Sequence, residues 1–373
     1  MAERRSRWAS PVLRTVAAAL FLITFLPLVE TDLWWVRMLE FPKLQLFLLT
    51  VAVMVLLIAW DRRQATIWAL LLALPLGFQA WRLVPYSPLY PVQMVNAEQC
   101  GADRQFSLLS ANVLQSNEDY ATTVEVVSAE EPDLFLAMET DARWIEGLRP
   151  IEAEFPYREL VPIDNTYGMA LYSRLPLSNT RVRYTVEPDI PSILTDVELR
   201  SGEKIAFLAI HPRPPLPGKD SGTRDAELVV SAGDVTEESR PVVIAGDLND
   251  VPWSATTRLF TRLAQVLDPR TGRGFYASFS AGFAGMDWPL DHVFTTEEFT
   301  HIDYRLAEDI GSDHRPVKAV VCLDKRDGPR LQEPESRDLE TLRQGREELG
   351  EGIAQQRAEM QAGEDETVMP EAD

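Results

Sequence analysis

Residues 242–252 carry the sequence VVIAGDLNDVP, in which a short apolar run ends at Gly246 and polar loop residues follow. Four consecutive apolar residues before the glycine are typical of a β-strand that is covered on both faces. Because side chains alternate along a strand end, Asp247 and Asn249 are expected to point to the same side. A carboxylate and an amide at this spacing can orient a water molecule and a phosphoryl oxygen together. Asp and Asn also make ordinary turns, so this stretch alone leaves both interpretations open.

Length and charge limit what surrounds this strand. The chain has 373 residues and a mass of 42.1 kDa, which exceeds one typical domain, and most of its apolar excess lies before residue 85. Residues 102–323 carry 20 Lys and Arg against 36 Asp and Glu, a net charge of −16. Such a domain repels a long polyanion unless a basic patch or a bound metal overrides the field. The composition therefore argues against nucleic acid as the substrate.

Three runs without a charged residue precede that region, at residues 15–29, 44–60 and 64–81. Each is close to the roughly 17 to 25 residues that cross a bilayer as a helix. The first run could instead be the core of a signal peptide, but no small-residue cleavage site follows it, and Trp34 and Trp35 suit a membrane interface. The sequence predicts three transmembrane helices, with a buried helical hairpin as the alternative.

The basic residues of the short loops predict the orientation. Arg4, Arg5, Arg7 and Arg14 precede the first run, and Arg62 with Arg63 separates the second from the third. Positive residues favour the cytoplasmic side, so three crossings place everything after Arg82 outside. We therefore expect a multi-pass protein of the bacterial inner (cytoplasmic) membrane whose residues after Arg82 are periplasmic.

Changes in composition divide the chain into four parts. Pro85, Pro88 and Pro91 mark an extended connection. Apolar strand patterns alternate with helical ones up to residue 323, which indicates a layered α/β (α+β) domain. The end of the chain is acidic and lacks aromatic residues, so we expect disorder there. The expected parts are a membrane domain at 1–82, a linker at 83–103, the α/β domain at 104–323 and a tail at 324–373.

Only two cysteines are present, Cys100 and Cys322, which excludes a zinc site built from cysteines. They lie just before the first expected core strand and at the end of the last. If these strands are neighbours in an oxidising compartment, a disulfide would close almost the whole domain. Two buried thiols are the alternative.

Polar residues also follow three other apolar runs. Asn112 ends FSLLSANV, Glu139 follows LFLAM, and His211 follows IAFLAI. Strand-end side chains converge at one edge of an α/β sheet, where binding sites form. Glu139 suits a hard cation such as Mg²⁺, and His211 can donate to a phosphoryl oxygen. Taken singly, an acid such as Glu139 is more often a surface residue, and a histidine such as His211 is more often structural.

Two further motifs lie near the end of the domain. Asp291 precedes the strand-like HVF, and residues 311–316, GSDHRP, present Asp313 and His314 before the strand VKAVVCL. Adjacent side chains face different sides, so one of this pair can hold a metal while the other faces the substrate. Asp291 is the candidate that fixes the tautomer of His314. A solvated turn is the alternative for GSDH.

Other stretches suggest local structure. YGMALYSRLPL, residues 167–177, predicts a hairpin, and Arg224 is expected to be a solvated helix charge rather than a phosphate ligand. Four large residues near the later motifs either line a substrate entrance or pack in the core: Trp253, Phe275, Tyr276 and Trp288.

In their order along the chain, these motifs resemble the endonuclease/exonuclease/phosphatase superfamily, also called deoxyribonuclease I-like. The resemblance covers about residues 104–323 and rests on SANV, LAMET, YSRLP, the histidine after LAI, GDLND, LDHVF and GSDHRP. It implies a four-layer α/β sandwich with two packed β-sheets and outer helices, here preceded by the three transmembrane helices. The superfamily includes nucleases, neutral sphingomyelinases and inositol-polyphosphate phosphatases.

The resemblance also implies residue roles. Glu139 would bind a divalent metal, Mg²⁺ or Mn²⁺, with Asn112 and Asp313 nearby. Asp247 would activate the attacking water and Asn249 would hold it. His314, paired with Asp291, would contact the scissile phosphate, and His211 would stabilise charge in the transition state. The family pattern implies no role for Asp250.

We therefore predict a membrane-anchored, divalent-metal-dependent phosphoester hydrolase, with a phosphodiesterase favoured. The basic, DNA-inserting loops of the nucleases are not evident; the loop after His211 has only Arg213 and Lys219. A lipid of the bilayer, a small phosphoester and nucleic acid remain open as substrates, and no protein partner is evident. The alternative is a catalytically inactive, membrane-tethered binding module of the same fold, although every implied position holds a chemically competent residue.

Overall fold

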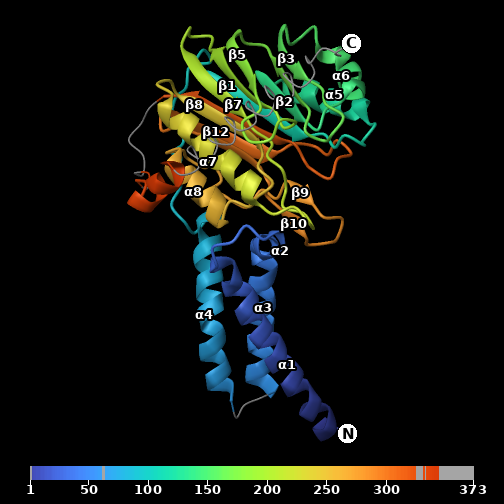
Figure 1. The fold of residues 1–373 in the computed structure, drawn as a ribbon, viewed down its shortest axis with the longest axis vertical. Helices are drawn as coiled ribbons and strands as arrows, with labels where there is room; N and C mark the ends of the chain where they lie inside the picture. The colour runs from blue at the N-terminus through green and yellow to red at the C-terminus, as the bar shows by residue number, and fades with distance from the viewer. Residues whose placement is uncertain (1, 61–63, 325–330, 332, 344–373) are drawn as a thin grey trace, which may run out of the picture.

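Alternating apolar side chains build two β-sheets that pack face to face above a bundle of long helices (Figure 1). The computed structural model describes residues 2–60, 64–324, 331 and 333–343. Along the first strand, Leu108 faces the space between the sheets while Leu109 faces outward. This alternation lets one strand contribute to two hydrophobic layers.

The first sheet has six strands. Neighbouring strands run antiparallel, except for β1 and β2 at the centre, which run parallel. In spatial order they are β12 (Phe299–Leu306), β13 (Val317–Leu323), β1 (Gln105–Asn112), β2 (Leu134–Met138), β4 (Met169–Ser173) and β3 (Tyr157–Val161).

The second sheet has five strands, in which β7 and β8 run parallel. Its spatial order is β11 (Asp291–Thr295), β8 (Val242–Asp247), β7 (Lys204–Ala209), β6 (Ser192–Glu198) and β5 (Leu177–Arg183). The expected buried strand is β8: Val243 and Ala245 pack between the sheets, and Val242 and Ile244 pack outward.

Helices cover the outer face of each sheet, which confirms the predicted four-layer arrangement. α5 (Tyr120–Glu130), α6 (Ala142–Gly147) and the short η4 (Arg149–Ile151) lie on the six-stranded sheet. α7 (Gly222–Glu237) and α8 (Ala255–Leu263) lie on the five-stranded sheet. Ser254 caps α8, because its side chain accepts a hydrogen bond from the Thr257 amide.

The YSRLP turn does not form a hairpin, and that prediction is wrong. β4 belongs to the six-stranded sheet and β5 to the five-stranded one, so the turn carries the chain from one sheet to the other. Apolar strands with a turn between them look alike in both cases, because sheet membership depends on distant partners.

Cys100 and Cys322 form a disulfide, with their Cα atoms 6.1 Å apart. β1 pairs antiparallel with β13, and Gln105 lies opposite Cys322. The two ends of the α/β region are therefore neighbours, and the bond closes a separation of 222 residues.

Three N-terminal helices are long and apolar enough to cross a membrane. They are α1 (Ala2–Phe25), α3 (Lys43–Trp60) and α4 (Ala65–Leu83), and their candidate spans are Pro11–Leu28, Lys43–Trp60 and Thr66–Tyr86. The helices extend as a bundle from one end of the α/β part (Figure 1).

Short elements lie where the bundle meets the sheets. η1 (Leu26–Leu28), α2 (Trp34–Arg37) and η2 (Met38–Glu40) connect α1 to α3, and η3 (Val84–Tyr86) follows α4. A two-stranded hairpin of β9 (Phe279–Ser280) and β10 (Asp287–Trp288) lies at the same end of the sandwich (Figure 1), where Phe41 contacts Trp288 and Gln45 contacts Gly285.

The stretch expected as a linker lies partly against the sheets. Met94 is fully buried in the core between them, and Ala97 donates a backbone hydrogen bond to His301 of β12. Of the expected tail, residues 325–330, 332 and 344–373 lie outside the described residues. Residues 336–343 are helical, and Asp338 forms an ion pair with Arg262 of α8.

Candidate active site

Five strand ends bring the predicted site residues to one edge of the sandwich. Asn112 ends β1, Glu139 follows β2, Asp247 ends β8, Asp291 begins β11, and His211 lies just beyond β7. The parallel pairs β1–β2 and β7–β8 place their carboxyl ends at a common edge, as expected for α/β sites. His314 joins them from the turn before β13.

Polar groups from both sheets surround Asp247 Oδ2. Asn112 Nδ2 donates to it over 3.2 Å and donates to Glu139 Oε1 over 2.8 Å. His211 Nε2 lies 3.8 Å and His314 Nε2 lies 3.6 Å from the same oxygen. One carboxylate oxygen thus faces an amide and two imidazoles. Burial raises the pKa of Asp247, although both histidines counter it.

His314 is oriented by Asp291, as the sequence predicts. His314 Nδ1 lies 2.7 Å from Asp291 Oδ2, and because a carboxylate only accepts, Nδ1 carries the proton. Burial lowers the pKa of His314, but the carboxylates of Asp291 and Asp247 outweigh it and raise the pKa to about 10. His314 is therefore a cation at neutral pH, with Nε2 as its second donor.

His211 differs from His314 in charge. It is fully enclosed, and burial lowers its pKa despite the nearby Asp247 carboxylate. Its ring packs against Tyr167 with the ring centres 5.3 Å apart, and its Nδ1 atom has no hydrogen-bond partner among the described residues. The site thus places a neutral imidazole and an imidazolium near one carboxylate oxygen.

The GDLND loop is held in an uncommon conformation. Gly246 has a φ of +151°, and a Cβ there would lie 1.8 Å from the Ile210 carbonyl oxygen. Asn249 has a φ of +51°, which is rare for a residue with a side chain. Its amide N–H donates to Asp247 Oδ1 over 2.8 Å, and its Nδ2 donates to the Pro212 carbonyl over 3.0 Å.

Asp313 and Glu139 occupy the rim. Glu139 is half-buried, its backbone φ is +62°, and its Oε2 accepts from the Gln115 amide. Burial raises the pKa of Glu139, although the hydrogen bonds from Asn112 and Gln115 lower it in part. The Asp313 side chain is exposed while His314 is buried, so the adjacent pair does face different sides. Within the described residues, no hydrogen bond or ion pair joins the Asp313 carboxylate to Asn112 or Glu139.

A protein-family model, the Endonuclease/Exonuclease/phosphatase family, matches residues 109–314. The chain belongs to this family. The match contains each strand end described above, and enzymes of the family hydrolyse phosphoester bonds. No curated protein sequence matches the chain.

Solved structures share the fold at low sequence identity. TDP2 from D. rerio, complexed with a single-strand DNA product, superposes with a TM-score of 0.51 at 16% identity, over 59% of this chain and 99% of that one. A humanised form of the D. rerio protein gives 0.50 at 16% identity, over 58% and 99%. TDP2 from Caenorhabditis elegans gives 0.50 at 16% identity, over 75% and 92%.

The donor set suits a divalent cation, which enzymes of this family use. Among the described residues, Asp247, Asp291 and His314 form a group whose ligand atoms all lie within 4.8 Å of one another. In that group, however, Asp291 already engages His314 Nδ1. Glu139 Oε1 and Asp247 Oδ2 accept from the same Asn112 nitrogen, so carboxylate and amide groups from three strand ends lie together. Oxygen donors of this kind are those that Mg²⁺ prefers.

Several features near the site do not follow from sequence spacing. Arg224 is buried rather than solvated, which corrects the expectation for it, and its Nη1 donates to the Asn249 carbonyl over 3.0 Å. Arg213 forms ion pairs with Glu187 and Asp189, so its charge is largely neutralised. The Phe279 ring lies 4.9 Å from His314. None of these contacts leaves a periodic pattern in the sequence.

The four large residues near the later motifs pack in the interior and do not line a substrate entrance. Trp253 and Trp288 belong to a buried cluster, Phe275 packs against it, and Tyr276 packs against the core between the sheets. Core packing was the interpretation that the sequence favoured, and the structure confirms it.

Proposed function

We propose that this chain is a membrane-anchored phosphodiesterase that depends on a divalent metal, Mg²⁺ or Mn²⁺. The observation that carries the proposal is the convergence on Asp247 Oδ2 of Asn112, His211 and His314, beside Glu139. Hydrolysis of a phosphoester needs a base for the attacking water and donors for the oxygens that gain charge. The cluster contains both in one place.

Asp247 acts as the base and orients the attacking water. Burial raises the pKa of its carboxyl, which brings a carboxylate closer to the pH at which proton transfer is most effective. Asn249 donates its backbone N–H to Oδ1, so Oδ2 is the oxygen that faces the reaction. Its side-chain amide helps to hold the water and the phosphate.

The two histidines act on the phosphoryl oxygens. His314 is charged and donates from Nε2, because Asp291 fixes the other nitrogen. His211 is neutral and its Nε2 lies 3.8 Å from Asp247 Oδ2, where a neutral imidazole stabilises developing charge without taking the proton from the base. A charged and a neutral donor together match an oxyanion that forms only in the transition state.

Glu139 and Asn112 would hold the metal, with Asp313 at the rim and Asp247 beside them. The bound cation supplies Lewis-acid stabilisation of charge on the phosphoryl group. Around that place four carboxylates, Glu139, Asp247, Asp291 and Asp313, stand against one charged histidine and the divalent cation, which leaves a formal charge of about −1. This balance repels a phosphomonoester dianion more than a diester monoanion, which favours diester substrates.

Lipid, small phosphoester and nucleic acid are the substrate classes to compare. The net charge of −16 over residues 102–323 disfavours a long polyanion, and an anchored domain is close to lipid headgroups. The D. rerio TDP2 structure was solved with single-strand DNA product, which keeps nucleic acid among the substrates to test.

The same proposal includes the location. Residues 1–82 form the membrane domain, 83–103 connect it, 104–323 form the catalytic domain and 324–373 the tail. Arg4, Arg5 and Arg7 at the start of α1 and Arg62 with Arg63 between α3 and α4 favour the cytoplasm, so the catalytic domain faces the periplasm of a bacterial inner membrane. A reporter that is active only in the cytoplasm, fused after residue 373, should be silent; activity there would contradict this orientation.

The full chain in detergent micelles tests the function. With Mg²⁺ we expect turnover of bis-p-nitrophenyl phosphate, abolished by EDTA and restored by Mg²⁺ or Mn²⁺. Assays with phospholipid and with DNA then rank the substrates. Glu139→Gln should weaken metal binding, measured by calorimetry, about 10- to 100-fold. Glu146→Gln on the exposed surface of α6 is the matched control and should change nothing. Absence of both turnover and metal binding would show instead a catalytically inactive binding module.

A further inference from the structure

Residues 32–45, which connect α1 to α3 and include the first three residues of α3, pack into the catalytic part of the chain. One hydrophobic cluster combines Phe41 of this segment with Val251, Trp253 and Trp288, and Met38 and Leu44 pack against it. The Trp253 indole N–H donates to the Glu40 carbonyl over 2.8 Å. Membrane segment and catalytic loops therefore share a core, unlike two domains joined by a flexible linker.

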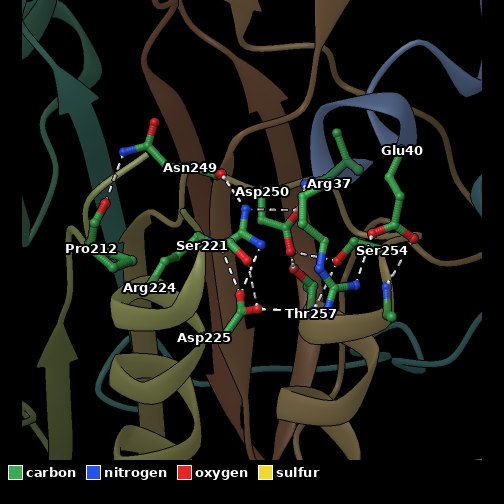
Figure 2. Close-up of polar contacts among 12 residues, drawn as sticks. Arg37, Glu40, Pro212, Ser221, Arg224, Asp225, Asn249, Asp250, Ser254 and Thr257 are labelled. Atoms are coloured by element: carbon green, nitrogen blue, oxygen red, sulfur yellow. Dashed lines mark hydrogen bonds and ion pairs between the residues drawn. The ribbon is translucent and has the colours of Figure 1, made fainter. Parts of the chain in front are cut away.

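A chain of polar contacts runs from this segment to the GDLND loop (Figure 2). Glu40 Oε1 accepts from the Ala255 amide over 3.3 Å, and its Oε2 lies 3.9 Å from Arg37 Nη1. Arg37 Nη2 lies 3.8 Å from Asp225 Oδ2, and Asp225 Oδ1 accepts from Arg224 Nη2 over 2.8 Å. These contacts connect η2, α2 and the first turn of α7.

Arg224 connects these contacts to the catalytic loop, because its side chain also binds Asn249 and Asp250. Its Nη1 donates to the Asn249 carbonyl over 3.0 Å and lies 3.5 Å from Asp250 Oδ1 (Figure 2). Asn249 has the left-handed backbone that orients its amide toward Asp247. Such a conformation costs roughly 1 to 3 kcal/mol and persists only where neighbours impose it. Arg224 is the neighbour that binds its carbonyl.

A second set of contacts connects the same segment to His314 through the β9–β10 hairpin. Gln45 Nε2 donates to the Gly285 carbonyl at the tip of the β9–β10 hairpin over 2.6 Å, and the Phe41 ring lies against Trp288 at 5.8 Å. Trp288 stacks on Phe279, whose ring lies 4.9 Å from His314. Thus the same segment supports the hairpin that packs on the charged histidine.

We infer that residues 32–45 are a positioning element of the active site, which holds the loop at 247–255 and the hairpin at 279–288 in the geometry that the reaction requires. The inference rests on the proposed hydrolase function. Arg37, Glu40, Gln45 and Arg224 are positioning residues, since they act through Asn249 and His314. The membrane anchor is thus part of the catalytic apparatus as well as a tether.

The experiment uses the full chain in detergent micelles and compares the wild type with Glu40→Ala, Glu40→Gln and Gln45→Ala. With bis-p-nitrophenyl phosphate and Mg²⁺, we expect kcat to fall about tenfold or more in Glu40→Ala, because small displacements of catalytic groups are costly. KM should stay within about twofold. Glu40→Gln keeps an acceptor for the Ala255 amide and should recover most of kcat. Glu30→Gln, in the same connection but paired with exposed Arg337, is the matched control.

Hydrogen exchange measured by mass spectrometry gives a readout that needs no substrate. Exchange should accelerate at residues 247–255 in Glu40→Ala and at residues 279–288 in Gln45→Ala, while β1 and β2 stay protected. Unchanged exchange at both places, or a kcat equal to that of the wild type in an active enzyme, would overturn the inference. If the wild type hydrolyses no phosphoester, the proposed function fails, and exchange alone decides whether the segment holds the loops.

Discussion

Two aspartates of the GDLND loop, Asp247 and Asp250, are equally buried at 1% exposure, yet their surroundings differ. Asp250 is saturated: its carboxylate accepts from the Val251 amide over 2.9 Å, Ser254 Oγ over 2.5 Å and Thr257 Oγ1 over 3.0 Å. Arg224 adds an ion pair at 3.5 Å. Its backbone carbonyl accepts in addition from His292 Nε2.

Asp247 is held more loosely at its Oδ2 atom, where the contacts to Asn112, His211 and His314 span 3.2 to 3.8 Å. A saturated carboxylate fixes a loop, because each hydrogen bond removes freedom and leaves no capacity for a ligand. A carboxylate with long contacts retains capacity for water. The comparison therefore assigns the reaction to Asp247 and the support of the loop to Asp250, three positions further along the chain.

The strongest test of the comparison removes the base. Asp247→Asn should lower kcat about a hundredfold to ten-thousandfold, the range that a general base contributes, and should leave thermal stability nearly unchanged. Asp234→Asn on α7 is the control, since Asp234 pairs there with Arg183 of β5. Retention of activity in Asp247→Asn would refute its assignment as the base.

Removing the supporting aspartate should act on stability instead. Asp250→Ala leaves buried Arg224 without its main buried counter-charge, and we expect a loss of about 3 to 5 kcal/mol in the free energy of unfolding. Denaturant unfolding of the micelle-bound chain measures it. A stable Asp250→Ala variant with a large loss of kcat would show that Asp250 takes part in the reaction and does not only support the loop.

The pH dependence of the stability tests Glu40, which contacts the supporting part of the loop at the Ala255 amide. Burial and the Asp250 carboxylate raise the pKa of Glu40 to about 7 from its ordinary 4.5. A pKa raised in the folded state contributes stability below pH 4.5 that is lost as the pH rises through 7. This amounts to about 3 kcal/mol at most. Melting curves at pH 5 and pH 8 should show it, and Glu40→Gln should flatten the difference. An equal pH dependence in that variant would contradict the buried position of Glu40.

The smallest effect concerns the helix cap. Ser254→Ala removes the hydrogen bond to Asp250 and the cap on the Thr257 amide, for a loss of about 1 to 2 kcal/mol. Melting temperature should fall while kcat stays the same. A drop in kcat would mean that Asp250 also controls the reacting half of the loop.

Much of the fold was predictable because strand patterns and strand-end polar residues are local signals. The apolar run before Gly246 and the runs before Asn112, Glu139 and His211 all form strands that end at one edge. The YSRLP turn was not predictable in this way, since its two strands pair with residues far along the chain. The expectation for Arg224 was wrong for the same reason: a charged residue at the start of a helix looks solvated until its distant partners are known.

What the sequence by itself determined is the set of chemical groups, their order, and the apolar periodicity that makes β8 a buried strand and three helices apolar enough for a bilayer. Tertiary structure alone decided which of two neighbouring aspartates stays loosely held. That choice depends on Arg224, Ser254 and His292, and on Glu40 of the membrane segment, more than 200 residues earlier. Burial and hydrogen-bond saturation are properties of packed surroundings, so identical side chains in one loop acquire different functions.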